Sequence, residues 1–254
     1  MRVGIETVFT SLPQFLVVCL VLAVAEAVYV LLGFGAGLIA VGSLALLLPE
    51  LRDVVVLLLL VNLPAELWVV RKSWRRISWR GVLLLFVGVG LGIPLGTWLL
   101  RWGNPSFLLV VLGVFLVAVG AVFLVTPRPR RHGWPPWVAP PTGFLSGVLT
   151  GLFGTGGPPL VLYYQLGGAD KTAFRGNLMA IFLLMTTVRV PSYAAFGLIT
   201  APRLWSALAV MPAVLLGAFV GNHIHLRLEE TTFRRMVSIA LILIGLLLVM
   251  PGGS

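Results

Sequence analysis

Long apolar segments separated by short polar ones run along almost the whole chain. Hydropathy alone marks eight of them: 13–48, 54–70, 81–100, 105–126, 138–164, 174–198, 203–222 and 233–250. A helix of about 20 apolar residues crosses the hydrocarbon core of a bilayer. Backbone groups in lipid must also be paired within their own segment, which a helix achieves. We therefore predict an all-α polytopic membrane protein.

Glycine and proline interrupt two of these segments. The first contains Gly33–Gly37, with glycine at alternate positions, and the fifth contains the run GLFGTGGPP over residues 151–159. A glycine in a helix interior costs about 1 kcal/mol and a proline about 3 kcal/mol. We expect both helices to break at membrane depth, so that each segment forms a helix pair, either a hairpin or a re-entrant pair.

The positions of Lys and Arg decide how the segments are threaded. If every segment crosses once, the two sides carry 10 and 7 basic residues. If the two interrupted segments return to the side that they left, the sides carry 13 and 4, and the basic loops are 71–80, 128–131, 171–175 and 227–235. Cytoplasmic loops are enriched in Lys and Arg. We therefore predict the second threading, with those loops in the cytoplasm.

The second half of the chain repeats the order of features in the first. Residues 34–37 match 153–156, and an Asn follows in each half, 25 residues after Gly37 and 21 after Gly156. Later, 91–101 matches 216–227, since each has two glycines four residues apart and ends in Leu-Arg. With the threading above, the halves are inverted copies, each a glycine-broken helix pair plus three transmembrane helices.

The duplication divides the chain at its central basic loop. We predict a first transmembrane repeat over 1–126, a cytoplasmic linker over 127–137 and a second transmembrane repeat over 138–254.

Composition excludes several classes of protein. Hydrophobic residues make up 59% of the 254 residues and charged residues 10%, against about 25% charged in a soluble domain. The net charge of +10 lies mainly between apolar segments, where it faces lipid headgroups rather than nucleic acid. We expect the lipid bilayer as a partner and no nucleic acid.

The chain offers little material for redox, metal or covalent chemistry. Cys19 is the single cysteine, and His223 and His225 are spaced for opposite faces of a helix with no carboxylate at ligand spacing. No P-loop, dinucleotide fingerprint or nucleophile motif occurs. We expect no metal, no cofactor and no enzyme activity. Most tryptophans lie near predicted span ends, as interfacial anchors do: residues 68, 74, 79, 102, 134, 137 and 205.

These motifs resemble a known family. Gly33–Gly37 with Pro49, and 154–158 followed by 175–177, are similar to motifs of the sulfite exporter TauE/SafE family of bacterial membrane permeases, over nearly the whole chain. Ala36 and Leu38 stand where more glycine is common in that family. The resemblance implies a multi-pass protein of the bacterial inner membrane that moves sulfite, sulfonates or similar small organosulfur anions, usually outward.

The glycine breaks are the predicted binding site. Transporters with inverted repeats place broken helices near the midplane. A half-helix N-terminus has unpaired N–H donors and about half a positive charge, which suits a small oxyanion. We predict that six residues hold the substrate, with the Thr155 hydroxyl as an extra donor: Gly35, Gly37, Gly154, Thr155, Gly156 and Gly157.

Glycines also allow helices to pack closely. This is the alternative for the breaks, and it is our prediction for the pairs Gly92/Gly96 and Gly217/Gly221. Asn62 and Asn177 occupy equivalent positions in the two repeats. They either donate amide N–H groups to the anion or form interhelical hydrogen bonds.

Two charged residues lie inside predicted spans. Arg189 stands 14 positions beyond Arg175, about 21 Å along a helix, and a central Arg costs roughly 2.5–3.5 kcal/mol. Anion binding would justify that cost, and snorkelling before Pro191 is the alternative. Glu26 lies within the first half-span, where a carboxyl either protonates or finds a partner. It would carry a coupling proton or form a structural hydrogen bond.

The leading interpretation is export of a small organosulfur anion, such as sulfite or a sulfonate, by alternating access. The anion would sit where the two broken segments meet. A second interpretation is a channel or a permease for an unrelated small metabolite or ion. A third is a membrane-embedded enzyme or assembly subunit without transport.

Overall fold

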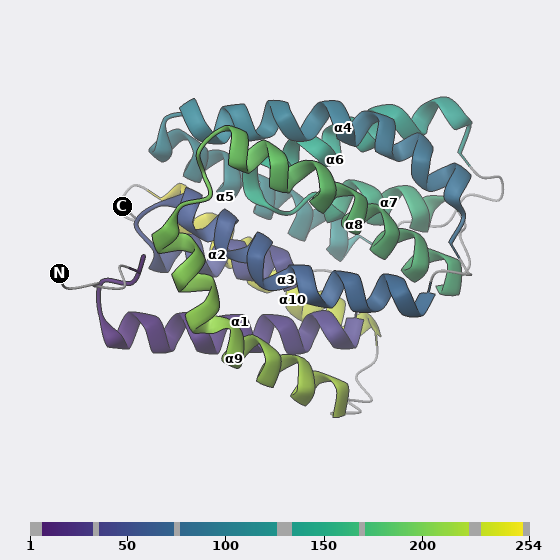
Figure 1. Ribbon diagram of the computed structural model, residues 1–254. Helices are drawn as coiled ribbons and strands as arrows, with labels where there is room; N and C mark the ends of the chain where they lie inside the picture. Colours follow the sequence, from purple (N-terminus) through teal and green to yellow (C-terminus); the bar gives the residue numbers. More distant parts are fainter. Residues whose placement is uncertain are drawn as a thin grey trace. The chain divides into compact units, whose positions relative to one another are not determined.

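The computed structural model of the chain describes residues 7–32, 36–73, 77–125, 134–167, 171–223 and 230–250. These residues are mostly helical, and no β-strand is found among them (Figure 1). The elements in chain order are α1 (Leu12–Leu32), α2 (Ala36–Leu47), α3 (Leu51–Ser73), α4 (Trp79–Trp102), α5 (Pro105–Leu124), the 3-10 turn η2 (Pro136–Val138), α6 (Ala139–Phe153), α7 (Gly157–Leu166), α8 (Lys171–Ala195), α9 (Ala201–His223) and α10 (Glu230–Val249). The prediction of an all-α chain is confirmed.

Many of these helices suit a bilayer. Within the described ranges, four helical stretches are long and apolar enough to cross one: Trp79–Trp102, Pro105–Leu124, Gly176–Ala195 and Ala201–Gly221. Shorter apolar helices cover Leu12–Val28, Gly37–Leu47 and Arg235–Val249. Leu91 and Phe219 on the outer faces are 69% and 62% exposed, which water would penalise and lipid does not. The chain is a multi-pass membrane protein.

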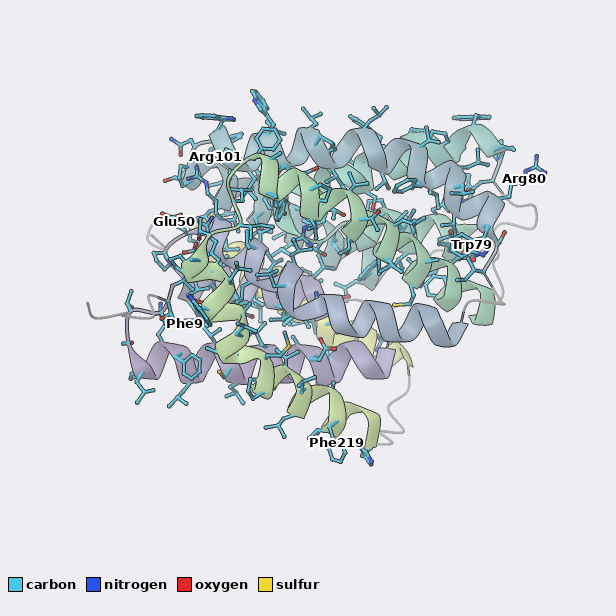
Figure 2. The ribbon with its side chains drawn as sticks, viewed as in Figure 1. Phe9, Glu50, Trp79, Arg80, Arg101 and Phe219 are labelled. Atoms are coloured by element: carbon cyan, nitrogen blue, oxygen red, sulfur yellow. The ribbon has the colours of Figure 1, made fainter. Side chains whose placement is uncertain are left out.

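The ends of α4 show how the helices are anchored. Trp79 and Arg80 lie at its first turn and Arg101 at its last (Figure 2). The guanidinium carbon of Arg101 is 5.0 Å from the ring centroid of Trp102. Aromatic and basic residues at both ends of an apolar helix are typical of the two membrane interfaces.

The two interrupted segments each form two helices. In the first, α1 ends at Leu32 and α2 begins at Ala36, while residues 33–35 lie outside the described part of the chain. In the second, α6 ends at Phe153, and Gly154 caps it in the left-handed region with φ 73° and its N–H bonded to Thr150 O at 2.9 Å. The predicted break is therefore confirmed in the second half.

The helices pack into two compact units, each described separately. Unit 1 comprises Met1–Val61, Gly103–Thr126 and Ile199–Ser254, and unit 2 comprises Asn62–Trp102 and Pro127–Leu198. In unit 1, α9 packs on α1, and α10 packs on α5 and α2. In unit 2, α4 packs on α6 and α8, and α7 contacts both α6 and α8. Both units combine elements from the two predicted repeats, whose boundaries stay a prediction.

Glycine brings α4 and α6 together in unit 2. Three glycines one turn apart on α4 face three on α6: Gly88, Gly92 and Gly96, and Gly143, Gly147 and Gly151. A Cβ at Gly92 would lie 2.3 Å from the Phe144 carbonyl oxygen, and one at Gly96 would lie 2.2 Å from that of Val148. Only glycine permits this approach of two backbones. The predicted packing role of Gly92 and Gly96 is confirmed.

The α1–α9 contact in unit 1 is built in a related way. A Cβ at Gly217 would lie 2.2 Å from the Ala23 carbonyl oxygen, and one at Gly221 would lie 2.5 Å from that of Ala27. The packing role predicted for this second glycine pair is also confirmed.

Candidate functional site at the break between α6 and α7

The chain between α6 and α7 leaves several backbone donors available. Among the described residues, the amides of Thr155, Gly156 and Gly157 have no hydrogen-bond acceptor. Pro158 and Pro159 follow directly and have no N–H. The donors at the start of α7 are therefore concentrated in three consecutive residues, an arrangement that suits a small anion.

The hydroxyl groups around the break differ in their availability. The Ser146 Oγ donates to the Gly156 carbonyl oxygen, and the Thr150 Oγ1 donates to Ser146 O at 2.8 Å. Thr155 is 9% exposed, and its hydroxyl has no hydrogen-bond partner within the described ranges. Thr155 is therefore the side-chain donor that this turn leaves for a ligand.

The glycines of the break serve different purposes. A Cβ at Gly156 would lie 2.1 Å from both Ser146 O and Thr150 Oγ1, so glycine there lets the turn pack onto α6. The nearest atom to a Cβ at Gly157 is Phe182 Cζ at 3.5 Å, which is ordinary contact. Packing therefore requires glycine at residue 156 but not at residue 157, where the absence of a side chain suits the close approach of a ligand.

Helix α8 runs along the same turn of α6. Met185 Sδ lies 3.5 Å from Thr150 Oγ1, and the Tyr193 hydroxyl donates to Gly151 O at 3.0 Å. Arg189 stands four residues from each of them, on the same face of the helix. Arg189 is 5% exposed. Its positive charge therefore lies beside the C-terminal end of α6, where the helix dipole also favours a cation.

The two asparagines predicted in the site have separate surroundings. Asn177 is buried, and its Oδ1 accepts a hydrogen bond of 2.7 Å from the Ser78 backbone N–H. It precedes Arg189 by twelve residues, about 18 Å of helix, so the two side chains lie at different levels of α8. Asn62 lies half-buried in α3. The bond to Ser78 supports the structural alternative for Asn177.

The other first-half residues belong to unit 1 or lie outside the described ranges. Gly35 is one of the residues that the structure does not describe. Gly37 lies in α2 and Glu26 in α1, both in unit 1. Glu26 is 5% exposed, and no hydrogen-bond or ion-pair partner of its carboxyl occurs among the described residues. The roles of these three residues stay predictions.

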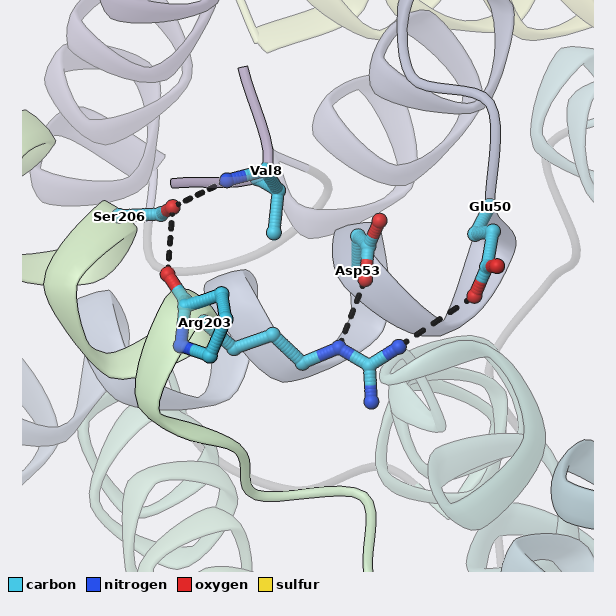
Figure 3. A network of polar contacts seen from close by, with 6 residues as sticks. Val8, Glu50, Asp53, Arg203 and Ser206 are labelled. Atoms are coloured by element: carbon cyan, nitrogen blue, oxygen red, sulfur yellow. Dashed lines mark hydrogen bonds and ion pairs between the residues drawn. The ribbon is translucent and has the colours of Figure 1, made fainter. Parts of the chain in front are cut away.

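A polar network in unit 1 was not predicted from the sequence. Arg203 Nε donates to Asp53 Oδ1 at 2.7 Å, and Arg203 Nη2 lies 3.4 Å from Glu50 Oε2 (Figure 3). The Ser206 Oγ accepts from the Val8 N–H at 2.9 Å. Burial raises the pKa of the Asp53 carboxyl, and the hydrogen bond from Arg203 opposes that rise. The network fixes the starts of α3 and α9 to each other.

Sequence reasoning also missed Tyr193. Its ring centroid lies 4.9 Å from the Arg189 guanidinium carbon, and the side chain is fully buried at 0% exposure. The signal in the sequence was that Tyr193 follows Arg189 by four residues, because residues four apart meet on one helix face.

The chain matches a family model over most of its length. Residues 18–248 match the model described as Sulfite exporter TauE/SafE. The chain belongs to this family. The break between α6 and α7 and the whole of α8 lie inside the matched range. The TauE/SafE family is one of membrane transporters, as the resemblance implied.

Individual TauE/SafE relatives match over most of their own length. The "Probable sulfite/organosulfonate exporter TauE" of Cupriavidus necator is 27% identical, over 87% of this chain and 88% of that protein. The "Probable inner membrane transporter protein TsaS" of Comamonas testosteroni is 23% identical, over 75% and 80%. The "Probable membrane transporter protein YunE" of Bacillus subtilis is 23% identical, over 94% and 98%. No solved structure matches the chain.

Proposed function

We propose that this protein exports a small organosulfur anion, such as sulfite or a sulfonate, across the bacterial inner membrane by alternating access. The observation that carries the proposal is the set of donors at the α6–α7 break. The amides of residues 155–157 and the Thr155 hydroxyl lie in one turn, and Arg189 lies beside the end of α6 that leads into it. Charge-assisted hydrogen bonds to an oxyanion are stronger than neutral ones.

The names of the relatives support the class of substrate and the membrane. TauE is named a "probable sulfite/organosulfonate exporter" and TsaS a "probable inner membrane transporter protein". A sulfite or sulfonate group presents several oxygens on one small centre, which three adjacent amides and a hydroxyl match.

Helix packing supports the internal duplication. In the predicted repeats, α4 and α9 are corresponding helices, and so are α6 and α1. The α4 helix packs on α6, and α9 packs on α1, while the last helices α5 and α10 pack on each other. Two copies related by a two-fold axis would exchange partners in this way, as repeats of secondary transporters do.

The membrane potential gives a physical reason for transport of the anion out of the cell. An inside-negative potential is worth about 2.3 kcal/mol per charge per 100 mV. An anion therefore leaves the cell downhill unless its external concentration is high. Uptake would need a coupled proton, for which Glu26 is the candidate.

Flux in proteoliposomes tests the proposal. Vesicles containing the purified protein are loaded with sulfite, methanesulfonate, sulfate or chloride, and the initial rate of efflux is measured against concentration. We expect saturable flux of at least one sulfur anion. Thr155→Val should raise the KM about tenfold or more, because it removes a hydrogen bond to a charged ligand. Arg189→Gln should raise it further.

The chain offers a matched control. Thr187 is exposed on α8, and its hydroxyl donates to Leu184 O at 2.7 Å. Thr187→Val should leave the KM unchanged. Absence of flux for every sulfur anion would refute the substrate class. Flux that rises linearly without saturation would favour the channel interpretation.

A further inference from the structure

We propose that Tyr193 is a positioning residue of the anion site, which holds the Arg189 guanidinium at the C-terminal end of α6. The inference rests on the proposed function, in which Arg189 binds the anion. Tyr193 would not touch the substrate itself. It would act through the arginine.

The hydroxyl of Tyr193 fixes its ring to α6. The side chain is fully buried, and the hydroxyl donates to Gly151 O at 3.0 Å, with Thr150 O at 3.4 Å. Both acceptors belong to the last turn of α6, directly before Gly154 caps the helix. A buried phenol usually finds a partner for its hydroxyl. Here the partner ties α8 to the turn that leads into the break.

The ring of Tyr193 in turn limits where Arg189 can lie. The guanidinium carbon is 4.9 Å from the ring centroid, within the range of a cation–π contact. An arginine has many rotamers in solution, and restricting them in advance lowers the entropy cost of binding. A guanidinium that is already in place binds an anion more tightly than one that must be ordered by it.

The contacts on either side leave Arg189 little freedom to move along α6. Met185 meets Thr150 one turn before Arg189, and Tyr193 meets Gly151 one turn after it. The arginine thus lies between two contacts to adjacent residues of α6. A purely structural role for Tyr193 would stabilise unit 2 without affecting the affinity for the anion, so the two roles differ in what a substitution changes.

A double-mutant cycle separates these roles. Tyr193→Leu removes both ring and hydroxyl, whereas Tyr193→Phe keeps the ring. Each is made in the native and the Arg189→Gln background, and the KM and maximal rate of efflux are measured per folded protein. We expect Tyr193→Leu to raise the KM about 3- to 20-fold in the native background. It should have no further effect in Arg189→Gln, and Tyr193→Phe, which keeps the ring but loses its hydrogen bond to Gly151 O, should raise the KM less than Tyr193→Leu.

One control variant and two contrary outcomes complete this test of Tyr193. Phe123→Leu removes another buried aromatic ring, on α5 of unit 1, and should change stability without changing the KM. If Tyr193→Leu raises the KM equally in both backgrounds, it does not act through Arg189, and the inference is wrong while the proposed function stands. If Arg189→Gln leaves the KM unchanged, the proposed role of the arginine fails and the inference with it. Tyr193→Met replaces the leucine variant if that variant does not fold.

Discussion

The α4–α6 and α1–α9 interfaces bring helices into backbone contact by different means. Between α4 and α6, both helices supply glycine, three residues from each. Between α1 and α9, glycine comes from α9 alone, at Gly217 and Gly221, and meets the backbone at Ala23 and Ala27. The first contact extends over two turns of each helix, and the second over one.

The two contacts differ because α6 leads into the candidate site, whereas α9 does not. The α6 helix ends at the break that offers backbone donors, so a shift of α6 would displace the donors themselves. The six-glycine contact fixes α6 along most of its length. In unit 1 the shorter contact is accompanied by the Arg203–Asp53 ion pair at the start of α9. Close packing positions the candidate site, whereas a polar link helps to hold α9.

The largest effect should come from a methyl group in the middle of the α4–α6 contact. Gly92→Ala places a Cβ 2.3 Å from a backbone oxygen, so the helices must separate, at a cost of about 3 kcal/mol. Gly90→Ala on the same helix is the matched control, because nothing lies within 4 Å of its Cβ. Unfolding free energies in detergent micelles should differ accordingly. Equal stabilities would show that this contact does not hold α6.

Breaking the ion pair of unit 1 should give the second-largest loss of stability. Arg203→Gln leaves Asp53, whose side chain is 12% exposed, without its charged partner, at a cost of about 2 kcal/mol. Burial then raises the pKa of Asp53 without the opposing hydrogen bond. A folded-state pKa raised above the unfolded value costs stability as the pH rises through it. The variant should therefore lose stability as the pH rises from the unfolded-state pKa of Asp53 to its raised folded-state pKa, with the full loss above that pH.

Two companion variants sharpen the test of the ion pair. Glu50→Gln should have little effect, because the Glu50 side chain is 57% exposed and lies 3.4 Å from Arg203. Adding Asp53→Asn to Arg203→Gln should restore part of the stability and remove the loss that develops as Asp53 ionises. A pH-independent loss would mean that Arg203 acts by packing alone.

A substitution at the end of the α1–α9 contact should cost less than its counterpart in unit 2. Gly221→Ala places a Cβ 2.5 Å from Ala27 O, but α9 can tilt away from a contact that extends over one turn. We expect a loss of about 1.5 kcal/mol, measured as for Gly92→Ala. A loss as large as that of Gly92→Ala would contradict the distinction between the two interfaces.

The smallest loss of stability should come from a substitution in the cap of α6. Gly154 has φ 73°, so Gly154→Ala should cost about 1 kcal/mol from the left-handed backbone. Gly154→Asn should cost less, because asparagine tolerates that conformation. If the cap orients the donors, the alanine variant should lose anion flux even where the folded protein remains fully populated. Unchanged flux would indicate that the α4–α6 contact alone positions them.

The elements were largely predictable from the sequence, whereas their grouping was not. Apolar length and the glycine and proline runs set the helix bounds, since each is a local property of consecutive residues. The spacing of four residues within Gly92/Gly96 and Gly217/Gly221 also predicted that these glycines pack helices together. Which helices form a unit depends on contacts between distant segments, and hydropathy carries no information about them.

The candidate site was likewise predictable from the sequence only in part. Thr155 and Gly157 were identifiable from the GTGGPP run, because backbone donors follow from where a helix must stop. The assignment of Asn177 to the site relied on equivalence between the repeats and stays a prediction, since its oxygen accepts from Ser78 while the predicted role used its N–H groups. Tyr193 was not identified because its role depends on the carbonyl of Gly151, which lies 42 residues away in the sequence.

The proline pair that opens α7 has a consequence for how this segment can move. In a continuous helix through residues 153–160, the rings of Pro158 and Pro159 would collide with carbonyls one turn earlier, and two rungs of the hydrogen-bond ladder would be lost. Single prolines lie inside α4 and α9, at Pro94 and Pro212, but here two adjacent prolines follow the left-handed Gly154, so joining α6 and α7 into one straight helix would cost more than a single proline does. If the protein works by the proposed alternating access, α6 and α7 would therefore tilt as two separate pieces, because the break between them persists.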